Sequence, residues 1–153
     1  MVTSVIFNSV EVISDFEGFR SNPYQDVRGI WTVGFGFTEW NGYQVTKTYP
    51  KSVSLSDAQQ HLKVLADMTA KQIQSLVKIP LNQNQLTALT SFVFNVGLSN
   101  FKGSTMLKLL NSGHIQQASA QFLLWDHAGT HVVQGLLCRR RKEQMIFDTP
   151  LEN

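Results

Sequence analysis

The sequence has a single cysteine, Cys138, among its 153 residues. One cysteine excludes an internal disulfide, which fits synthesis in a reducing cytosol. Cys138 lies between apolar and basic residues in a stretch with helical spacing. We therefore expect it to be a small buried hydrophobic residue and not a nucleophile.

The sequence also lacks a secretion signal and a membrane span. Its first residues, "MVTSVIFNSVEVISDFE", have no positively charged start, and polar residues interrupt any apolar core. No run of about 18 apolar residues is present. We expect no stable membrane insertion and a start in the cytoplasm, so action outside the cytoplasm would require another protein to let this one out.

Charge of one sign is scarce as well. The formal net charge is +2, only 16% of residues are charged, and 42% are hydrophobic. This balance is typical of a folded globular domain and lacks the large basic surface of a dedicated nucleic-acid binder. The one strong charge run is "RRRK" at 139–142, and it falls on a predicted helix. Consecutive helical residues point in different directions, so these four charges lie on more than one face of the helix. We expect no nucleic-acid partner.

The spacing of apolar residues predicts an α+β fold in one domain. Apolar residues at helical spacing predict an N-terminal helix over about 3–17, and glycines, aromatics and the turns Asn22-Pro23 and Asn41-Gly42 predict a small antiparallel sheet over about 24–49. We expect a β-rich lobe over about 18–55 and a larger helical lobe over about 56–153, joined by the N-terminal helix. Further helices are predicted from 56 to Pro80 and over 82–96, 104–111, 114–125 and 132–147.

Two carboxylates flank the first turn. Glu17 is predicted at a helix C-terminus between Phe16 and Phe19, where the helix dipole and partial desolvation favour its protonated form. Asp26 lies in "YQDVRG" beside Arg28, which favours the ionised form. One protonated and one ionised carboxyl group are what acid and base catalysis at a glycosidic bond requires. A surface glutamate and a turn-forming aspartate remain the structural alternatives.

The segment "WTVGFGF" at 31–37 follows these carboxylates. If it is one strand, the side chains of Thr32, Gly34 and Gly36 share a face. Glycines inside a strand often allow another backbone or a ligand to approach closely. We expect a slot beside Thr32 that admits a sugar, with Thr32 helping Asp26 to hold a water molecule.

The stretch "EGFR…PYQDVRGIWTVGFGFT" resembles the active site of phage-type lysozymes, glycoside hydrolase family 24. In that family a Glu, an Asp after eight intervening residues and a Thr after five more form the catalytic set, and Glu17, Asp26 and Thr32 have this spacing. The resemblance continues through "LNQNQLTALTSFVFNVGLSNFKGSTMLKLLN" and "GLLCRRRKE", so it covers nearly the whole chain.

The resemblance implies a lysozyme-like fold and a muramidase that hydrolyses the β-1,4 bond between N-acetylmuramic acid and N-acetylglucosamine. It places Asn95 near the cleft between lobes and brings an arginine of the last helix, Arg139 or Arg140, toward the catalytic Glu. Gly34, Gly36, Asn95, Phe94 and Ser104 are the predicted substrate-binding residues. Structural alternatives remain for three of them: a hydrogen-bonding role for Asn95, helix capping for Ser104 and Thr105, and core packing for Phe94 and Phe101.

The chain departs from the family at Phe37, where His is common after "GFG". Strand alternation assigns Phe37 to the apolar face, so we expect repacking there and not the loss of a catalytic group. Any salt bridge or pH sensitivity that this His provides in relatives is then in doubt.

Alternatives on other chemistry are weaker. A lytic transglycosylase can work with one acid, and a non-catalytic peptidoglycan-binding module has no use for the complete set of Glu17, Asp26 and Thr32. Asp126, His127 and His131 resemble a metal-ligand pattern, but Gly129 and Thr130 interrupt the helix and no further ligand cluster follows. We expect no cofactor and no metal, a monomer acting on bacterial peptidoglycan, and release from the cytoplasm through a holin.

Overall fold

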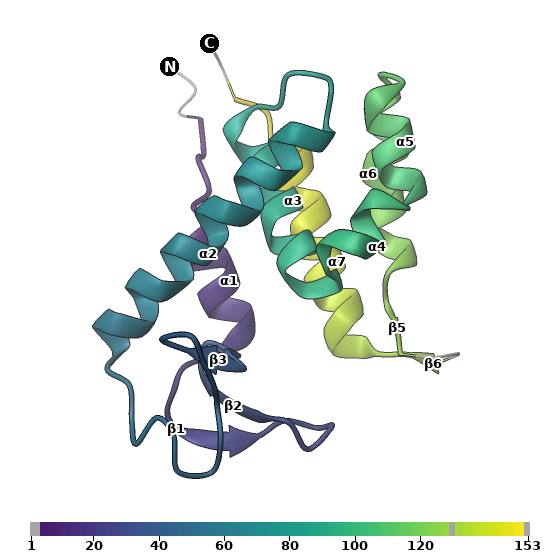
Figure 1. Cartoon of the computed structure of the whole chain (residues 1–153). Helices are drawn as coiled ribbons and strands as arrows, with labels where there is room; N and C mark the ends of the chain where they lie inside the picture. Colours follow the sequence, from purple (N-terminus) through teal and green to yellow (C-terminus); the bar gives the residue numbers. More distant parts are fainter. Residues whose placement is uncertain (1–3, 129–130, 152–153) are drawn as a thin grey trace. The chain divides into compact units, whose positions relative to one another are not determined.

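The computed structural model describes residues 4–128 and 131–151, and of residues 128 and 131 the backbone alone. It is an α+β fold, as predicted, with helices and small antiparallel sheets (Figure 1). The chain forms two compact units, which we describe separately. The β-rich unit comprises Val10–Leu65, and the helical unit comprises Met1–Ser9 with Ala66–Asn153.

The β-rich unit begins with helix α1 (Ser9–Glu17). Strand β1 (Arg20–Gln25) pairs antiparallel with β2 (Trp31–Gly34), and β3 (Glu39–Trp40) pairs with β4 (Tyr43–Gln44). Positive φ angles at Asn41 (50°) and Gly42 (83°) close the second hairpin, which confirms the turn predicted there. A register irregularity between Arg20 and Tyr24 accommodates Pro23 in β1.

Two predictions for this part of the chain are wrong. The first helix begins at Ser9 and not near residue 3, because the preceding segment pairs its backbone with helix α3 (Gln83–Val96): Asn84 contacts Val5 and Phe7, and Thr87 donates to the Phe7 carbonyl. The strand predicted through Phe37 ends at Gly34, where φ is +67° and the chain turns.

Phe37 is nevertheless buried, as predicted. Its ring packs edge-on against the His61 imidazole of helix α2, with centroids 4.6 Å apart, and stacks on Trp40 at 6.0 Å. Phe35 continues the aromatic contacts from Phe37 to Phe19. Phe37 therefore belongs to an aromatic core. The histidine in that core is His61 of α2, and not a residue at position 37.

The helical unit is built around α3 and the last helix. Helix α2 (Leu55–Leu76) runs from one unit into the other, and α3 starts with a capping box formed by Asn82 and Gln85. Its remaining elements are α4 (Leu98–Lys102), α5 (Thr105–Asn111), α6 (Ile115–Gln121), a 3-10 turn (Phe122–Leu124), β5 (His127–Ala128), β6 (His131–Val132) and α7 (Gln134–Asp148). These positions confirm the predicted helices with two differences: the helix predicted from 56 to Pro80 ends at Leu76, and the one predicted over 114–125 ends early in the 3-10 turn. Helix α4 was not predicted.

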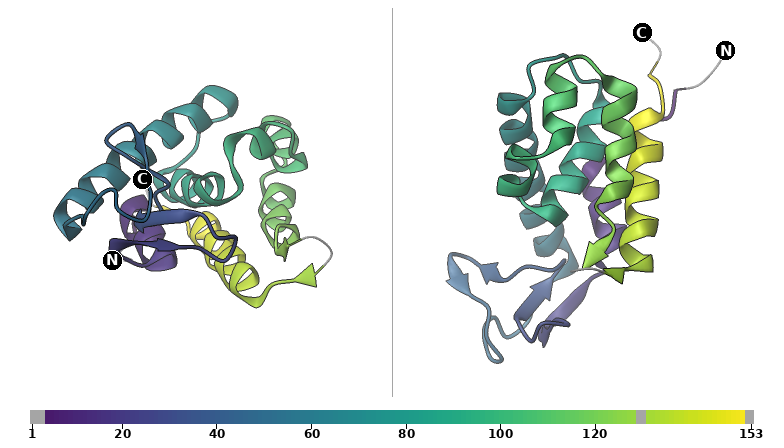
Figure 2. Two further views of the ribbon diagram at one scale, coloured as in Figure 1. Left: turned by 60° about the horizontal axis from the view of Figure 1, so that its bottom comes forward. Right: turned by 90° about the vertical axis from the view of Figure 1, so that its right-hand side faces the viewer.

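Helices α3 and α7 lie side by side within this unit (Figure 2). Aromatic rings pack near these two helices. The ring centroid of Phe92 lies 5.3 Å from that of Phe122 and 5.5 Å from that of Trp125, and the Phe122 ring also contacts Phe147. Cys138 is exposed, so the prediction that it is buried is wrong. The buried face of α7 is occupied by Arg139, Arg140, Glu143, Ile146 and Phe147 instead.

Candidate active site

Glu17 is the last residue of α1, as predicted. The helix stops there because Gly18 adopts φ +69° and donates its N–H to the Ser14 carbonyl at 2.9 Å. Gly36 faces the Glu17 carboxyl group: a Cβ atom at Gly36 would lie 3.0 Å from Glu17 Oε2. The absence of a side chain at Gly36 thus leaves room for Glu17.

Asp26 is held by the turn that joins β1 to β2. Its Oδ1 accepts hydrogen bonds from the backbone N–H groups of Arg28 (2.8 Å) and Ile30 (2.9 Å), and its Oδ2 lies 3.7 Å from an Arg28 guanidinium nitrogen. The hydrogen bond from Ile30 is the main reason that the pKa of Asp26 is lowered, with Arg28 adding to it. Asp26 is therefore both a turn residue and an ionised carboxylate.

Thr32 is connected to Asp26 through a single residue, Ile30. The Thr32 hydroxyl donates to the Ile30 carbonyl at 2.9 Å, and the Asp26 N–H donates to that same carbonyl at 2.9 Å. Because its proton is used in this way, the Thr32 oxygen faces any further partner as an acceptor. The backbone of Ile30 thus connects Asp26 to Thr32, a link that no residue type signals in the sequence, since any residue has the same backbone groups.

Tyr24 is a second residue that was missed. It pairs with Thr32 across the hairpin, and the Arg20 guanidinium lies 4.3 Å from its ring centroid. Burial raises the pKa of Tyr24, Arg20 opposes this, and the charges of Glu17 and Asp26 raise it further. The charges of both carboxylates therefore raise the pKa of the same phenol. Its strand position two residues before Asp26 was the signal in the sequence.

A surface hollow of about 450 Å³ accompanies these groups. It is lined by Phe19, Arg20, Ser21, Asn22, Pro23 and Tyr24, all from β1 or the residue before it. The two residues of the cation–π pair, Arg20 and Tyr24, thus contribute to a concave surface within the β-rich unit.

Gly34 does not open a slot within the β-rich unit. A Cβ atom there would lie 2.8 Å from Phe37 Cδ2, so the missing side chain makes room for the Phe37 ring. The argument from strand alternation fails because the strand ends at Gly34. Gly36 also faces protein atoms, those of the Glu17 carboxyl group. Packing therefore explains the glycine at both positions, and sugar binding by Gly34 or Gly36 stays a prediction.

Three predicted substrate-binding residues lie in the helical unit. Ser104 caps α5: its hydroxyl accepts from Leu107 N–H (3.1 Å), donates to the Phe101 carbonyl (2.7 Å) and is buried. This confirms its capping role. Phe94 is half-buried and Asn95 is exposed, whereas Phe101 is a fully buried core residue.

A buried network of charges lies between α3 and α7. Glu143 accepts hydrogen bonds from the Ser91 hydroxyl (2.6 Å), from Arg139 Nε (3.2 Å) and from Arg140 Nη1, and all four of these residues are buried. Arg140 also contacts Asn95. The predicted approach of Arg139 or Arg140 to Glu17 joins different units and stays a prediction, whereas Arg141 is exposed.

Asp126, His127 and His131 are the residues whose sequence resembles a metal-ligand pattern. Asp126 Oδ1 lies 2.5 Å from His127 Nδ1. Gly129, Thr130 and the His131 side chain lie outside the described residues. In the part of the chain that is described, no group of three or more His, Cys, Asp or Glu side chains is arranged to hold a metal ion.

Comparison with known proteins decides the family. Residues 14–143 match the phage lysozyme family. The chain belongs to the phage lysozyme family. It is 40% identical to the endolysin of Salmonella phage P22 over 92% of this chain and 94% of that protein.

Solved structures agree with the family. The endolysin from Escherichia coli O157:H7 phage FAHEc1 superposes with a TM-score of 0.85 at 26% identity, covering 95% of this chain and 94% of that one. The muramidase domain of SpmX from Asticaccaulis excentricus gives a TM-score of 0.78 at 32% identity, covering 97% and 100%. This phage lysozyme is therefore an enzyme that degrades peptidoglycan, with the lysozyme-like fold expected from its sequence.

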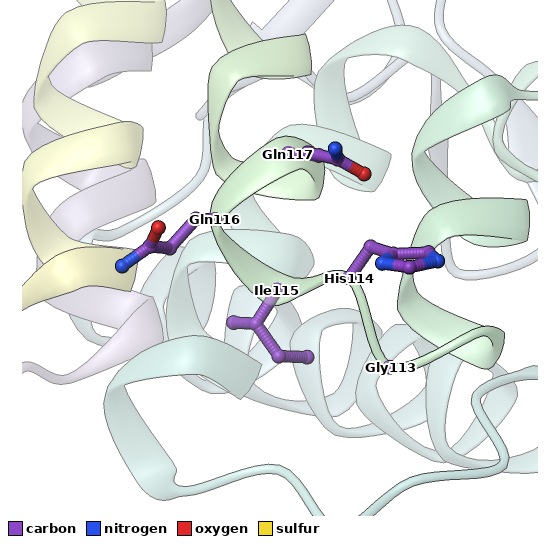
Figure 3. A pocket seen from close by; sticks show the side chains of 5 residues that line it. All are labelled: Gly113, His114, Ile115, Gln116 and Gln117. Atoms are coloured by element: carbon purple, nitrogen blue, oxygen red, sulfur yellow. The ribbon is translucent and has the colours of Figure 1, made fainter.

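A second hollow of about 360 Å³ lies in the helical unit of this phage lysozyme. Figure 3 shows its lining residues, Gly113, His114, Ile115, Gln116 and Gln117, at the turn before α6 and in its first residues. None of the predicted site residues lines it, and the five include no carboxylate. Its chemistry does not match that of a glycosidase site, which requires two carboxyl groups.

Across residues 4–128 and 131–151, no helix has the length and apolarity that a bilayer crossing needs.

Proposed function

We propose that Glu17, Asp26 and Thr32 carry out the hydrolysis of the β-1,4 bond between N-acetylmuramic acid and N-acetylglucosamine. Glu17 donates a proton to the leaving glycosidic oxygen, and a water molecule attacks the anomeric carbon from the opposite face. The water proton passes to Asp26. No cofactor takes part in this sequence of steps.

The observation that carries the proposal is the sharing of Ile30 by Asp26 and Thr32. Asp26 Oδ1 is used by two backbone N–H groups, so Oδ2 is the oxygen that accepts from water. The Thr32 hydroxyl donates its hydrogen bond to the Ile30 carbonyl, so its oxygen offers a lone pair to the water. A water that donates one proton to each of these oxygens directs its own lone pair away from the hairpin, toward a bound sugar.

The charge state of Asp26 fits this role. Its lowered pKa keeps it ionised at neutral pH, so it can accept a proton from water. A carboxylate that acts through a water molecule inverts the configuration at the anomeric carbon. We therefore expect inversion, which proton NMR of the newly formed reducing sugar detects.

Asp26→Asn tests the proposal. The amide can still accept the two backbone hydrogen bonds through its oxygen, but it accepts a proton far less readily, so we expect a loss of about 10²–10⁴-fold in kcat/KM with an unchanged fold. Thermal unfolding monitors the fold. Full activity in this variant would show that Asp26 is only a turn residue.

Product analysis separates hydrolysis from transglycosylation. Mass spectrometry of fragments from purified cell walls should find reducing ends, which require water as the nucleophile. Anhydro sugars would instead show that a hydroxyl group of the sugar replaces water.

We also propose that the enzyme is a monomer that reaches the periplasm from the host cytoplasm through a holin. The match to phage endolysins supports a role in lysis. Expression with and without a holin gene tests the route: lysis should require the holin. Lysis without it would contradict this part of the proposal.

A further inference from the structure

The hollow beside β1 is a concave surface that the proposed mechanism does not use. All of its lining residues, 19–24, belong to the β-rich unit. Arg20 pairs with Gly34 and Tyr24 pairs with Thr32, so residues 21–23 of β1 lie opposite residue 33 alone. Extra residues on one strand leave the regular ladder of hydrogen bonds. The hollow therefore lies where β1 departs from β2.

Backbone groups of the following loop hold this irregular part of β1 in place. The Val53 N–H donates to the Ser21 carbonyl at 2.8 Å, and Asn22 Nδ2 donates to the Lys51 carbonyl at 3.1 Å. The Ser21 hydroxyl donates to Asn22 Oδ1 at 3.2 Å. The polar side chains of Ser21 and Asn22 are thus already used within the protein, and the hollow is a fixed feature of the hairpin.

Arg20 is the cationic group of the hollow. Its guanidinium carbon lies over the Tyr24 ring, 4.3 Å from the ring centroid, so the ring covers one face of the cation. A guanidinium group has five N–H donors, all in its plane, and no acceptor. Within residues 4–128 and 131–151, the exposed Arg20 side chain has no hydrogen bond or ion pair. Its donors are therefore available to a ligand.

These features favour a carboxylate as that ligand. The planar fork of an arginine side chain matches a carboxylate, which accepts two parallel N–H hydrogen bonds. Contact with the Tyr24 ring restricts the Arg20 side chain, so less rotamer freedom is lost on binding. Phe19 and Pro23 add apolar surface to the hollow. A charged group beside apolar side chains is typical of ligand sites.

Tyr24 connects the hollow to the proposed catalytic groups. It lines the hollow, pairs with Thr32 across the hairpin and precedes Asp26 by two residues. A substituent of a sugar bound at Asp26 and Thr32 can therefore reach the hollow along β1. Peptidoglycan has such a substituent, because a stem peptide is attached to each muramic acid sugar.

We propose that the hollow binds a stem peptide of peptidoglycan, with Arg20 donating two hydrogen bonds to a carboxylate of that peptide and Tyr24 positioning Arg20. The proposal rests on the proposed function, since it takes peptidoglycan as the substrate, and it adds the part of the substrate that lies beside the glycan. Stem peptides have free carboxylates for Arg20 and alanine methyl groups for Phe19 and Pro23.

Titration of the whole enzyme with an isolated stem peptide tests the inference. The probe is the tripeptide L-alanyl-γ-D-glutamyl-L-lysine, and NMR follows the backbone amide signals of the hollow. We expect these signals to shift, and Arg20→Gln, which removes the charge and the planar fork, to raise the Kd about three- to tenfold. The tripeptide with both carboxylates amidated should cause no shift. No shift with the free tripeptide, or an equal Kd for Arg20→Gln and the parent, overturns the inference.

Two controls separate a specific site from general attraction of anions. Lys47→Gln removes the same charge from an exposed residue of the β-rich unit that does not line the hollow. Its Kd should stay within twofold of the parent value, and a rise equal to that of Arg20→Gln would contradict the proposed contact. Inorganic phosphate is the second control. If it shifts the same signals with an equal Kd, the hollow binds any small anion and the assignment to the stem peptide is wrong.

Variants of Tyr24 test its positioning role. Tyr24→Phe keeps a ring beside the guanidinium group, so the Kd for the tripeptide should stay within twofold of the parent value. Tyr24→Leu removes the ring and should raise the Kd about two- to fivefold. Binding by Tyr24→Leu that equals that of the parent would show that Tyr24 does not position Arg20.

Kinetics connect the hollow to the reaction. On soluble peptidoglycan fragments with stem peptides, Arg20→Gln should raise KM about three- to tenfold with kcat within twofold, whereas on fragments without stem peptides its KM should equal that of the parent. An equal rise on both substrates would overturn the inference. Absence of muramidase activity in the parent would overturn the proposed function instead, and tripeptide binding would remain measurable because it requires no catalysis.

Discussion

The β-hairpin that holds Asp26 and the buried network that holds Arg140 place polar groups by opposite means. Each hydrogen bond made by the side chains of Asp26 and Thr32 joins residues at most four positions apart. The hydrogen bonds that join Ser91 to Glu143 and Asn95 to Arg140 span 52 and 45 positions. Local bonds form as soon as the turn forms, whereas the network exists only when α3 and α7 are packed together. Substitutions in the two regions should therefore differ in whether they affect catalysis or stability.

Glu17→Gln should produce the largest effect on catalysis. The amide has the size of the carboxyl group but cannot donate the proton that the leaving group needs, so we expect a loss of about 10²–10⁴-fold in kcat/KM. Clearing of permeabilised cells measures the activity, and urea unfolding measures the fold. Activity within tenfold of the parent would contradict the assignment of Glu17 as the acid.

Glu143→Ala should produce the largest effect on stability. It leaves two buried arginines without their shared carboxylate, and removing one partner of a buried ion pair costs about 3–5 kcal/mol of unfolding free energy. Urea unfolding measures this loss against Glu39→Ala, an exposed glutamate in β3 whose removal should cost less than about 0.5 kcal/mol. Similar losses in both variants would show that the network does not stabilise the helical unit.

Gly36 and Gly34 provide a matched pair within one hairpin. Both have a positive φ, +82° and +67°, so alanine costs about 1–2 kcal/mol of unfolding free energy at either position. Gly36→Ala also displaces the Glu17 carboxyl group and should lower kcat/KM about tenfold or more.

Gly34→Ala instead meets the Phe37 ring and should cost about 1–3 kcal/mol more through overpacking, with a smaller effect on kcat/KM. Kinetics and urea unfolding of both variants test the difference. If Gly34→Ala impairs kcat/KM more than Gly36→Ala does, the assignment of Gly36 to the Glu17 environment is wrong.

His61 should give the smallest effect, seen only as a dependence of stability on pH. Burial lowers its pKa below the ordinary value of 6.5, so the folded protein favours the neutral imidazole. The contribution of the neutral His61 imidazole to the free energy of unfolding is fully present above pH 6.5 and is lost as the pH falls toward the folded-state pKa. The melting temperature of the parent should fall between pH 7 and pH 5 by more than that of His61→Phe. Parallel pH profiles would show that His61 does not titrate with folding.

Much of the β-rich unit could be predicted from the sequence because its determinants are local. Glu17 ends a helix since Gly18 follows it, Asp26 occupies a turn that its own side chain stabilises, and Asn41-Gly42 closes a hairpin by its positive φ angles. The spacing of Glu17, Asp26 and Thr32 sufficed for the family. The prediction that one strand continues to Phe37 is wrong from Gly34 onward. The chain turns there and places Phe37 against His61, a contact between residues far apart in sequence.

The sequence by itself determined the family, the end of α1 at Glu17 and the place of Asp26 in its turn, because these depend on residue types within a few positions. Only the tertiary structure decided the roles of Arg139, Arg140, Glu143 and Cys138 on α7. The sequence presents three arginines as a charge run. Two of them are buried because Glu143 on the same helix and Ser91 and Asn95 on the neighbouring α3 provide hydrogen-bond acceptors. A charged side chain is buried only where such hydrogen-bonding partners are present, and the sequence does not specify which helices pack together.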